Sequence, residues 1–257
     1  MYRVLEANQE VRERRHQLRH PAYAKPQRVA TAPYSAWTSD ITMLLGLAKW
    51  TYYYPYVILE IYSRYVVGWM LAQRESQHLA ERLIRETLVK ECIHRDQLTI
   101  DSDRGAAMRS HAVTQLMATL GVIKSVSRPH VRDDNPFSES PFKALKYRHD
   151  FPDRFARYDH GLDFCRGFFR WHNAEHRHGG IGLLTPALMH TGQATAVLEA
   201  GASVLAAAHA RHPERFVRGV SWPLTSAEEV GINPPENRPT GRTPERPRDT
   251  TIVPQVS

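Results

Sequence analysis

The sequence predicts an α/β fold in which a mixed five-stranded sheet is flanked by helices. Three apolar runs of strand length come first, over residues 40–45, 56–62 and 65–71, and short polar connections join them. This pattern is typical of an antiparallel meander. Farther along the chain, helical periodicity alternates with short apolar runs. That alternation predicts helices that cover the faces of the sheet and strands that extend it.

The alternating part begins at Ser76, which can cap a helix over residues 77–92 whose apolar side chains fall on one face. A short strand is expected at 97–101. A second helix, over 110–120, ends before a glycine, and a fifth strand is expected at 122–126.

The remaining elements are helical or lie outside the core. We expect a helix that starts near Glu139, another over 161–173 and an Ala-rich one over 194–209. A short helix over 4–19 lies in a basic arm that prolines separate from the core. The predicted organisation is a basic arm and linker at 1–33, a core at 34–190, a C-terminal helix at 191–217 and a Pro-rich disordered tail at 218–257.

Charge points to a polyanionic partner. The chain of 257 residues has 34 Lys plus Arg against 27 Asp plus Glu, a net charge of +7. Its first thirty residues hold seven basic and three acidic side chains, so +4 of that total lies in the arm. Such an arm suits DNA, although a merely solvated terminus would have the same composition.

The two cysteines and the hydropathy pattern exclude several classes of protein. Cys92 and Cys165 are isolated, which indicates neither a disulfide framework nor a zinc site. No stretch approaches the eighteen or so apolar residues of a membrane span, and the N-terminus lacks the apolar segment of a signal peptide. We expect a cytoplasmic protein with no membrane partner.

Three acidic residues in different local settings carry the chemistry. Asp40 interrupts a strand-like stretch, Asp103 follows a strand end next to a glycine, and Glu139 lies near a helix start. Hard divalent cations prefer carboxylate oxygens, and a pair of cations can clamp the attacking and leaving oxygens of a phosphodiester. Together these residues predict a metal-dependent enzyme that acts on nucleic acid.

Each acid also has a structural explanation when it is considered alone. Asp40 would suit a solvent-facing edge strand, Asp103 an Asx turn, and Glu139 the positive end of a helix dipole. Asp101 competes with Asp103, because residues two apart on a strand share a face.

The motifs occur together and in order, and they extend from Trp37 to about Phe216. They comprise Trp37-Thr38-Ser39-Asp40, the run Ile58 to Trp69, Ser102-Asp103-Arg104-Gly105, Ser127-Arg128-Pro129-His130 leading to Glu139, and Trp171-His172-Asn173 with His176, His178, Gly182, Thr185 and Pro186. This set resembles the catalytic core of DDE transposases from bacterial insertion sequences of family three, which is similar to retroviral integrase.

The resemblance implies a ribonuclease-H-like core that cleaves DNA strands and transfers them during transposition. It implies Asp40, Asp103 and Glu139 as catalytic residues that bind two Mg²⁺ or Mn²⁺ ions. The expected partners are transposon-end and target DNA and further copies of the chain on that DNA, near the nucleoid. The family's helix-turn-helix-like end-recognition region is not in this sequence, so either a separate helix-turn-helix protein supplies it or the chain is a truncated remnant.

Basic and polar residues near the third acid and downstream are candidate DNA contacts. Lys143 and Lys146 follow Glu139 by about one and two helical turns, so they can track a DNA backbone. A solvated helix face explains them nearly as well. The other candidates are Arg128 and Arg132, before the helix, and Asn173 and His178, for which positioning is the alternative role.

Four departures from the family pattern favour the alternative of a truncated, catalytically decayed DNA-binding remnant. Glu60 stands in place of Asp and Asp101 in place of His. Pro55 enters a predicted central strand, and Pro141 either lies inside the helix of Glu139 or is tolerated in its first turn. A ribonuclease-H-like nuclease without strand transfer is a third hypothesis, which leaves the downstream His-Asn element unexplained.

Overall fold

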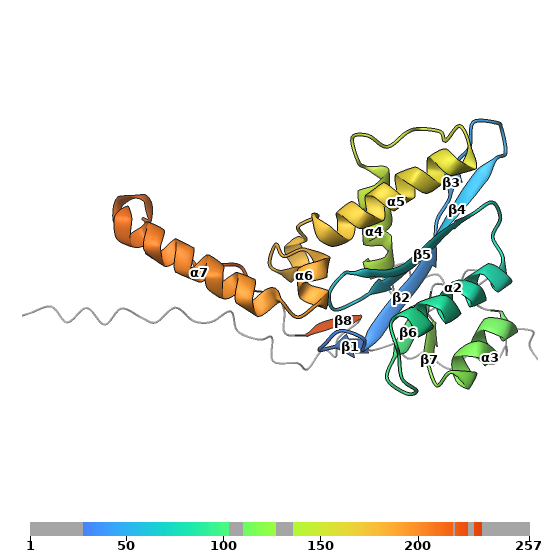
Figure 1. Cartoon of the computed structure of the whole chain (residues 1–257), viewed down its shortest axis with the longest axis horizontal. Coiled ribbons are helices and arrows are strands. Elements are labelled where there is room, and N and C mark those ends of the chain that lie inside the picture. The colour runs from blue at the N-terminus through green and yellow to red at the C-terminus, as the bar shows by residue number, and fades with distance from the viewer. Residues whose placement is uncertain (1–27, 103–109, 127–135, 218, 226–228, 233–257) are drawn as a thin grey trace, which may run out of the picture.

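The computed structural model describes residues 28–102, 110–126, 136–217, 219–225 and 229–232. Their centre is a mixed sheet with helices on both faces (Figure 1). Its strands are β2 (Ala36–Ile41), β3 (Leu44–Leu45), β4 (Tyr52–Glu60), β5 (Val66–Ala72), β6 (Thr99–Ser102) and β7 (Ile123–Val126). The α/β class is confirmed, and the two-residue strand β3 joins the five expected strands.

The strands lie in the order β5, β4, β2, β6, β7, and β3 also pairs with β4 beyond the end of β2. Strands β2, β4 and β5 are antiparallel neighbours, which confirms the predicted meander. Strand β6 runs parallel to β2, and β7 runs parallel to β6. An antiparallel meander extended by parallel strands is the ribonuclease-H-like arrangement that the resemblance implied.

Helices α2 (Gln77–Lys90) and α3 (His111–Thr119) cover one face of the sheet, and α4 (Pro136–Lys146) and α5 (Tyr158–Ala174) cover the other (Figure 1). Side chains alternate between these faces, as strand geometry requires. In β4, Tyr56 and Ile58 join the core under α2 and α3, whereas Val57 and Leu59 join the core under α4 and α5.

The predicted strand over 40–45 comprises two strands in the structure. Strand β2 starts at Ala36, four residues before the predicted start. The prediction began too late because Thr38 and Ser39 are polar, yet the structure buries both of them inside the sheet. It ends at Ile41, and β3 follows after two residues. Asp40 is therefore near the carboxyl end of the central strand.

Pro55 lies inside β4 as predicted, but the cost of its missing amide is reduced. Its carbonyl accepts a hydrogen bond from the Thr42 amide at 3.1 Å. In an antiparallel pair, the amide and carbonyl of one residue point to the same neighbour, so the missing donor also faces Thr42. Thr42 lies in the gap between β2 and β3, where the ladder is already interrupted.

Pro141 lies in the middle of α4, which starts at Pro136. The first-turn alternative is thereby excluded for this helix. A proline at this position cannot donate to the carbonyl of Phe137, four residues earlier, and this commonly bends or weakens a helix.

A short strand pair joins the two predicted flanking segments. Strand β1 (Arg28–Ala30), in the range assigned to the arm, pairs antiparallel with β8 (Val230–Ile232), in the range assigned to the disordered tail. Ala30 and Val230 are buried with Ala36 and Ile61. For these residues the prediction of a coreless arm and tail is wrong, because three-residue strands leave no periodicity to detect. The helix predicted at 4–19 lies outside the described residues.

The C-terminal part contains η2 (Gly179–Ile181), α6 (Pro186–His190), α7 (Ala194–Arg211) and η3 (Pro213–Arg215). Helix α7 confirms the Ala-rich prediction and points away from the sheet (Figure 1). It has no buried residue. Among the described residues, no helix has both the length and the apolar character to cross a membrane.

Candidate functional site

Asp40 lies on the sheet face that α4 and α5 cover. It is opposite Val57 in the β2–β4 register, and directly paired residues of antiparallel strands share a face. Val57 packs in the core that contains Phe142 and Leu145 of α4. The carboxylate of Asp40 is half-buried, and its Oδ1 accepts the amide of Ile41 at 2.8 Å.

Helix α4 turns one polar face toward the end of β2. Glu139, Lys143 and Lys146 are spaced by four and three residues, so they share this face. The Nζ of Lys146 donates to Oγ1 of Thr42 at 2.7 Å, two residues after Asp40. Burial lowers the pKa of Lys146, and the negative charge of Asp40 acts against that decrease. Asp40 and the face that carries Glu139 therefore belong to neighbouring elements.

Glu139 is accessible. Its side chain is 46% exposed, and its carboxylate forms a 3.6 Å ion pair with Lys143, whose side chain is 70% exposed. A pair at this separation and exposure contributes little to stability. The carboxylate thus remains open to a cation from solvent.

Strand β6 ends one residue before the second predicted acid. Asp103 itself lies outside the described residues, but its predecessor Ser102 pairs with Ser39, the residue before Asp40. Asp101 is opposite Thr38 in this parallel register and is almost fully buried. The choice of Asp103 over Asp101 stays a prediction.

Carboxylate oxygens from a strand end and a helix suit hard divalent cations. Asp40 and Glu139 supply such oxygens from facing elements, and this donor set fits Mg²⁺ or Mn²⁺. Within the described ranges there is no cluster of three His, Cys, Asp or Glu side chains that could hold a metal. Since Asp103 is outside those ranges, the predicted triad stays a prediction.

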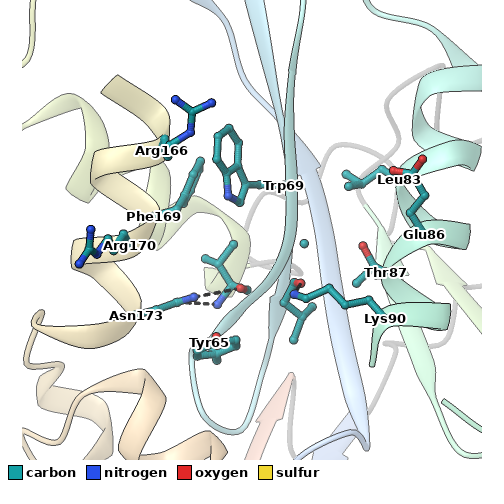
Figure 2. Close-up of a pocket in the computed structure, with 13 residues that line it drawn as sticks. Tyr65, Trp69, Leu83, Glu86, Thr87, Lys90, Arg166, Phe169, Arg170 and Asn173 are labelled. Carbon is teal, nitrogen blue, oxygen red and sulfur yellow. Dashed lines mark hydrogen bonds between the residues drawn. The ribbon is translucent and has the colours of Figure 1, made fainter. Parts of the chain in front are cut away.

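Asn173 binds the backbone of strand β5. Its side-chain amide accepts from the Val66 amide at 2.9 Å and donates to the Val66 carbonyl at 3.0 Å (Figure 2). Lys90 donates to the Val67 carbonyl at 2.8 Å on the same strand. These side chains satisfy backbone groups along the exposed edge of β5, which would otherwise invite another strand.

A hollow of about 420 Å³ lies along this edge. Figure 2 shows the side chains that line it, which come from β5, α2 and α5. Asn173 reaches into it from α5 and Lys90 reaches into it from α2. The contact of Asn173 with DNA stays a prediction, and its engagement with Val66 supports the positioning role that was the alternative.

His172 and His178 also bind backbone. The Nε2 of His172 lies 3.1 Å from the carbonyl of Arg64, and His178 Nδ1 accepts the amide of Gly180 at 3.1 Å. Burial lowers the pKa of His172 to about 4, and burial also lowers the pKa of His178. Both rings are therefore neutral at pH 7. The DNA contact of His178 stays a prediction, as do those of Lys143 and Lys146, while Arg128 and Arg132 lie outside the described residues.

Two charged residues, one at the end of β4 and one in the turn that follows, have structural roles that the sequence analysis did not predict. Glu60, regarded above as a departure, is completely buried, and its carboxylate accepts the amides of Tyr62 and Ser63 at 2.9 and 2.7 Å and the Ser63 hydroxyl. Arg64 is 8% exposed and was given no role. In the sequence, Glu60 and Arg64 stand between two strongly apolar runs. This placement was the signal that could have indicated buried charged residues.

Family comparisons match the part of the chain that holds these residues. The Integrase core domain family matches residues 30–131, and a second family with the same description matches residues 120–186.

Two curated relatives are similar to the chain. The transposase for insertion sequence element IS904 from Lactococcus lactis subsp. lactis is 26% identical over 164 residues, which cover 61% of this chain and 61% of the relative. The putative transposase InsK for insertion sequence element IS150 from Escherichia coli strain K12 is 22% identical over 157 residues, which cover 61% of this chain and 54% of the relative. The chain thus spans less than two thirds of the length of either relative.

Similar solved structures include the intasome of simian T-cell lymphotropic virus in complex with PP2A regulatory subunit B56 gamma. That match has 17% identity and a TM-score of 0.47, and covers 66% of this chain and 60% of that chain. The HTLV-2 integrase catalytic core domain in complex with magnesium, in its dimeric form, matches with 14% identity and a TM-score of 0.44. That match covers 62% of this chain and 97% of that chain.

Proposed function

Because the chain belongs to the integrase core family, among the transposases of bacterial insertion sequences, we propose that it cleaves DNA strands and joins them to a target during transposition. The observation that supports this most is the position of Asp40 beside the polar face of α4. Helix α4, which carries Glu139, contacts the chain two residues after Asp40 through the Lys146–Thr42 hydrogen bond, and β6, which ends one residue before Asp103, pairs with β2.

Asp40, Asp103 and Glu139 would hold two Mg²⁺ or Mn²⁺ ions. When bound, such ions polarise phosphate oxygens and increase the acidity of the attacking hydroxyl. The protein itself supplies positive charge for the DNA backbone. Lys143 projects into solvent from the polar face of α4, and Lys146 is held beside Asp40 by Thr42.

The reaction consists of two in-line displacements at phosphorus. In the first, a water oxygen attacks and the bond to the 3′ oxygen breaks, which leaves a 3′-hydroxyl and a 5′-phosphate. In the second, that 3′-hydroxyl attacks a target phosphodiester, and the displaced 3′ oxygen leaves with the proton. The carboxylates of the triad are not consumed, and the chain forms no bond to DNA.

The assembly is part of the same proposal. Copies of the chain act together on transposon-end and target DNA in the cytoplasm, at the nucleoid. A separate helix-turn-helix protein would supply the recognition of the transposon ends.

The test is Mg²⁺- or Mn²⁺-dependent nicking of a DNA substrate by the full chain. Asp40→Asn and Glu139→Gln preserve side-chain volume but remove a ligand charge, so each is expected to reduce nicking by about a hundredfold or more. The matched control is Asp163→Asn, at an exposed position of α5. Equal activity in all four proteins would refute the proposed site.

A second pair of variants separates the competing ligands on β6. Asp103→Asn is expected to abolish nicking while Asp101→Asn reduces it less. Equal losses, or persistent nicking by Asp103→Asn, would contradict the assignment of Asp103.

Pro141 distinguishes the active enzyme from a decayed DNA-binding remnant. Pro141→Leu restores an amide donor in the middle of α4 and is expected to stabilise the helix. If the parent chain is active, nicking changes little. If only Pro141→Leu cleaves, or if neither protein cleaves with Mn²⁺ and the end-recognition partner supplied, the remnant hypothesis replaces the enzyme.

A further inference from the structure

A cavity of about 220 Å³ lies between the turn after β4, the first half of α4 and the end of α5. Its lining consists of Leu59, Arg64, Phe137, Ser140, Pro141, His172 and His178. The volume is several times the roughly 30 Å³ that one water occupies in the liquid. Ser140 and Pro141 directly follow Glu139, so the cavity adjoins the candidate active site without including its carboxylates.

Arg64 brings a buried positive charge to this cavity. The residue is 92% buried, and no described residue accepts a hydrogen bond from its Nε or Nη1. Its guanidinium carbon lies 4.0 Å from the centre of the Phe137 ring, a contact that orients the group without satisfying its N–H donors. An arginine in such surroundings presents a fork of donors that matches an oxyanion.

The electrostatic surroundings favour a negative ligand over water alone. Burial lowers the pKa of Arg64 to about 10, and the charge of Glu60 only partly opposes this decrease. The guanidinium stays protonated at neutral pH, and a buried charge without a compensating partner is costly. A neutral water can bond to the donors but cannot balance the charge.

His172 and His178 add a donor and an acceptor to the lining. Since His178 Nδ1 accepts the Gly180 amide, its neutral ring carries hydrogen on Nε2. Since His172 Nε2 can only donate to the Arg64 carbonyl, its neutral Nδ1 is an acceptor, and no donor among the described residues reaches it. A ligand with both oxyanions and an O–H group complements this set.

We propose that the Arg64 cavity binds a phosphate group that still carries a hydrogen, either as inorganic phosphate or as the terminal phosphate of a DNA strand. A phosphodiester and a sulfate ion have no such hydrogen near neutral pH. A phosphomonoester, with a second pKa of ~6, keeps this hydrogen on about half of the molecules at about pH 6. The DNA source rests on the proposed function, because strand cleavage creates a 5′-phosphate, whereas the binding of inorganic phosphate does not.

The test measures inorganic phosphate binding to the full chain at pH 6 by calorimetry. Arg64→Gln is expected to weaken binding by about tenfold or more, because charged hydrogen bonds are lost. Ser140→Leu fills the cavity from α4 and is expected to have the same effect while Arg64 is retained, which covers the case in which Arg64→Gln fails to fold. The control is Arg170→Gln, at an exposed position of α5, which should bind like the parent.

Several outcomes would overturn the proposal. Undetectable binding to the parent chain would do so, as would equal binding by the parent and both cavity variants. Sulfate bound as tightly as phosphate would contradict the assignment to a hydrogen-carrying phosphate.

Oligonucleotides identify the source of the phosphate. The DNA source is supported if the parent chain binds a 5′-phosphorylated strand more tightly than the same strand with a 5′-hydroxyl, and if Arg64→Gln removes this difference. Arg64-dependent binding of inorganic phosphate alone supports the free ion. Nicking by the parent is measured on the same preparation, so a chain that binds phosphate but does not nick refutes the proposed function and leaves the cavity assignment intact.

Discussion

Glu60 and Glu139 are carboxylates in opposite surroundings. Glu60 is completely buried and accepts two backbone amides and a hydroxyl within the turn after β4. Glu139 is 46% exposed and has only a loose ion pair with Lys143 among the described residues. A carboxylate saturated with donors holds the fold together, whereas an accessible one can still bind a cation. The comparison separates a structural acid from a candidate catalytic acid more clearly than sequence does.

The largest effect expected from this comparison is on stability. Glu60→Gln replaces an acceptor oxygen with an amide group that faces the donors of Tyr62 and Ser63, and it removes the charge beside His190, whose Nδ1 lies 3.9 Å away. We expect the free energy of unfolding in urea to fall by about 3 to 5 kcal/mol. Glu139→Gln is the matched control and should change it by less than about 0.5 kcal/mol. Similar losses in both variants would mean that the two sites do not differ in this way.

The pH dependence of stability tests the buried end of α5. The pKa of His172 is about 4 in the folded chain and 6.5 ordinarily, so between these values the unfolded chain binds more protons. Stability is therefore fully present above pH 6.5 and falls as the pH decreases toward 4, by up to about 3 kcal/mol. His176 and His178, whose pKa values burial also lowers, contribute in the same direction.

Urea unfolding at pH 7, 5.5 and 4.5 measures this dependence. His172→Gln should flatten the pH profile, and His149→Gln, at an exposed position, is the matched control. A profile that is equally steep in the parent and in His172→Gln would contradict the role of His172.

A smaller effect is expected at the edge of β5. Asn173→Ala removes two hydrogen bonds to Val66, and water can replace part of them at a strand edge. We expect a loss of about 1 to 2 kcal/mol in the free energy of unfolding. Asn173→Asp keeps the acceptor and should lose less. If instead Asn173→Ala keeps its stability but loses affinity for DNA, the residue contacts DNA rather than positioning the strand.

The sequence predicted the larger elements because their side chains repeat over several residues. The meander, helices α2, α3, α5 and α7, and the parallel strands β6 and β7 all follow from such patterns. The β1–β8 pair and strand β3 are too short for a period to appear. The cost of Pro55 was overestimated because a break in the neighbouring ladder, at Thr42, depends on pairing that the sequence does not specify.

The candidate site was predicted only in part, for a related reason. Asp40 and Glu139 were recognisable by residue type and motif, and the structure places them on neighbouring elements. The roles of Arg64 and Asn173 depend on contacts between segments far apart in the chain. Asn173, for example, binds Val66 across 107 residues. No local pattern indicates such a partner.

Removal of the Lys143 charge on α4 is expected to have the smallest effect on stability and a separate effect on DNA binding. Lys143→Gln breaks an exposed ion pair with Glu139, so unfolding should change by less than about 0.5 kcal/mol. If Lys143 contacts a DNA phosphate, the slope of log K against log salt should decrease in magnitude by about 0.9. Arg82→Gln is the matched control, because Arg82 forms a similar exposed ion pair with Glu86 on α2, which covers the opposite face of the sheet. Fluorescence anisotropy with duplex DNA from low to moderate salt measures both slopes. Equal slopes for Lys143→Gln and Arg82→Gln would mean that the polar face of α4 does not track the DNA backbone, and would leave Lys143 as a solvated partner of Glu139.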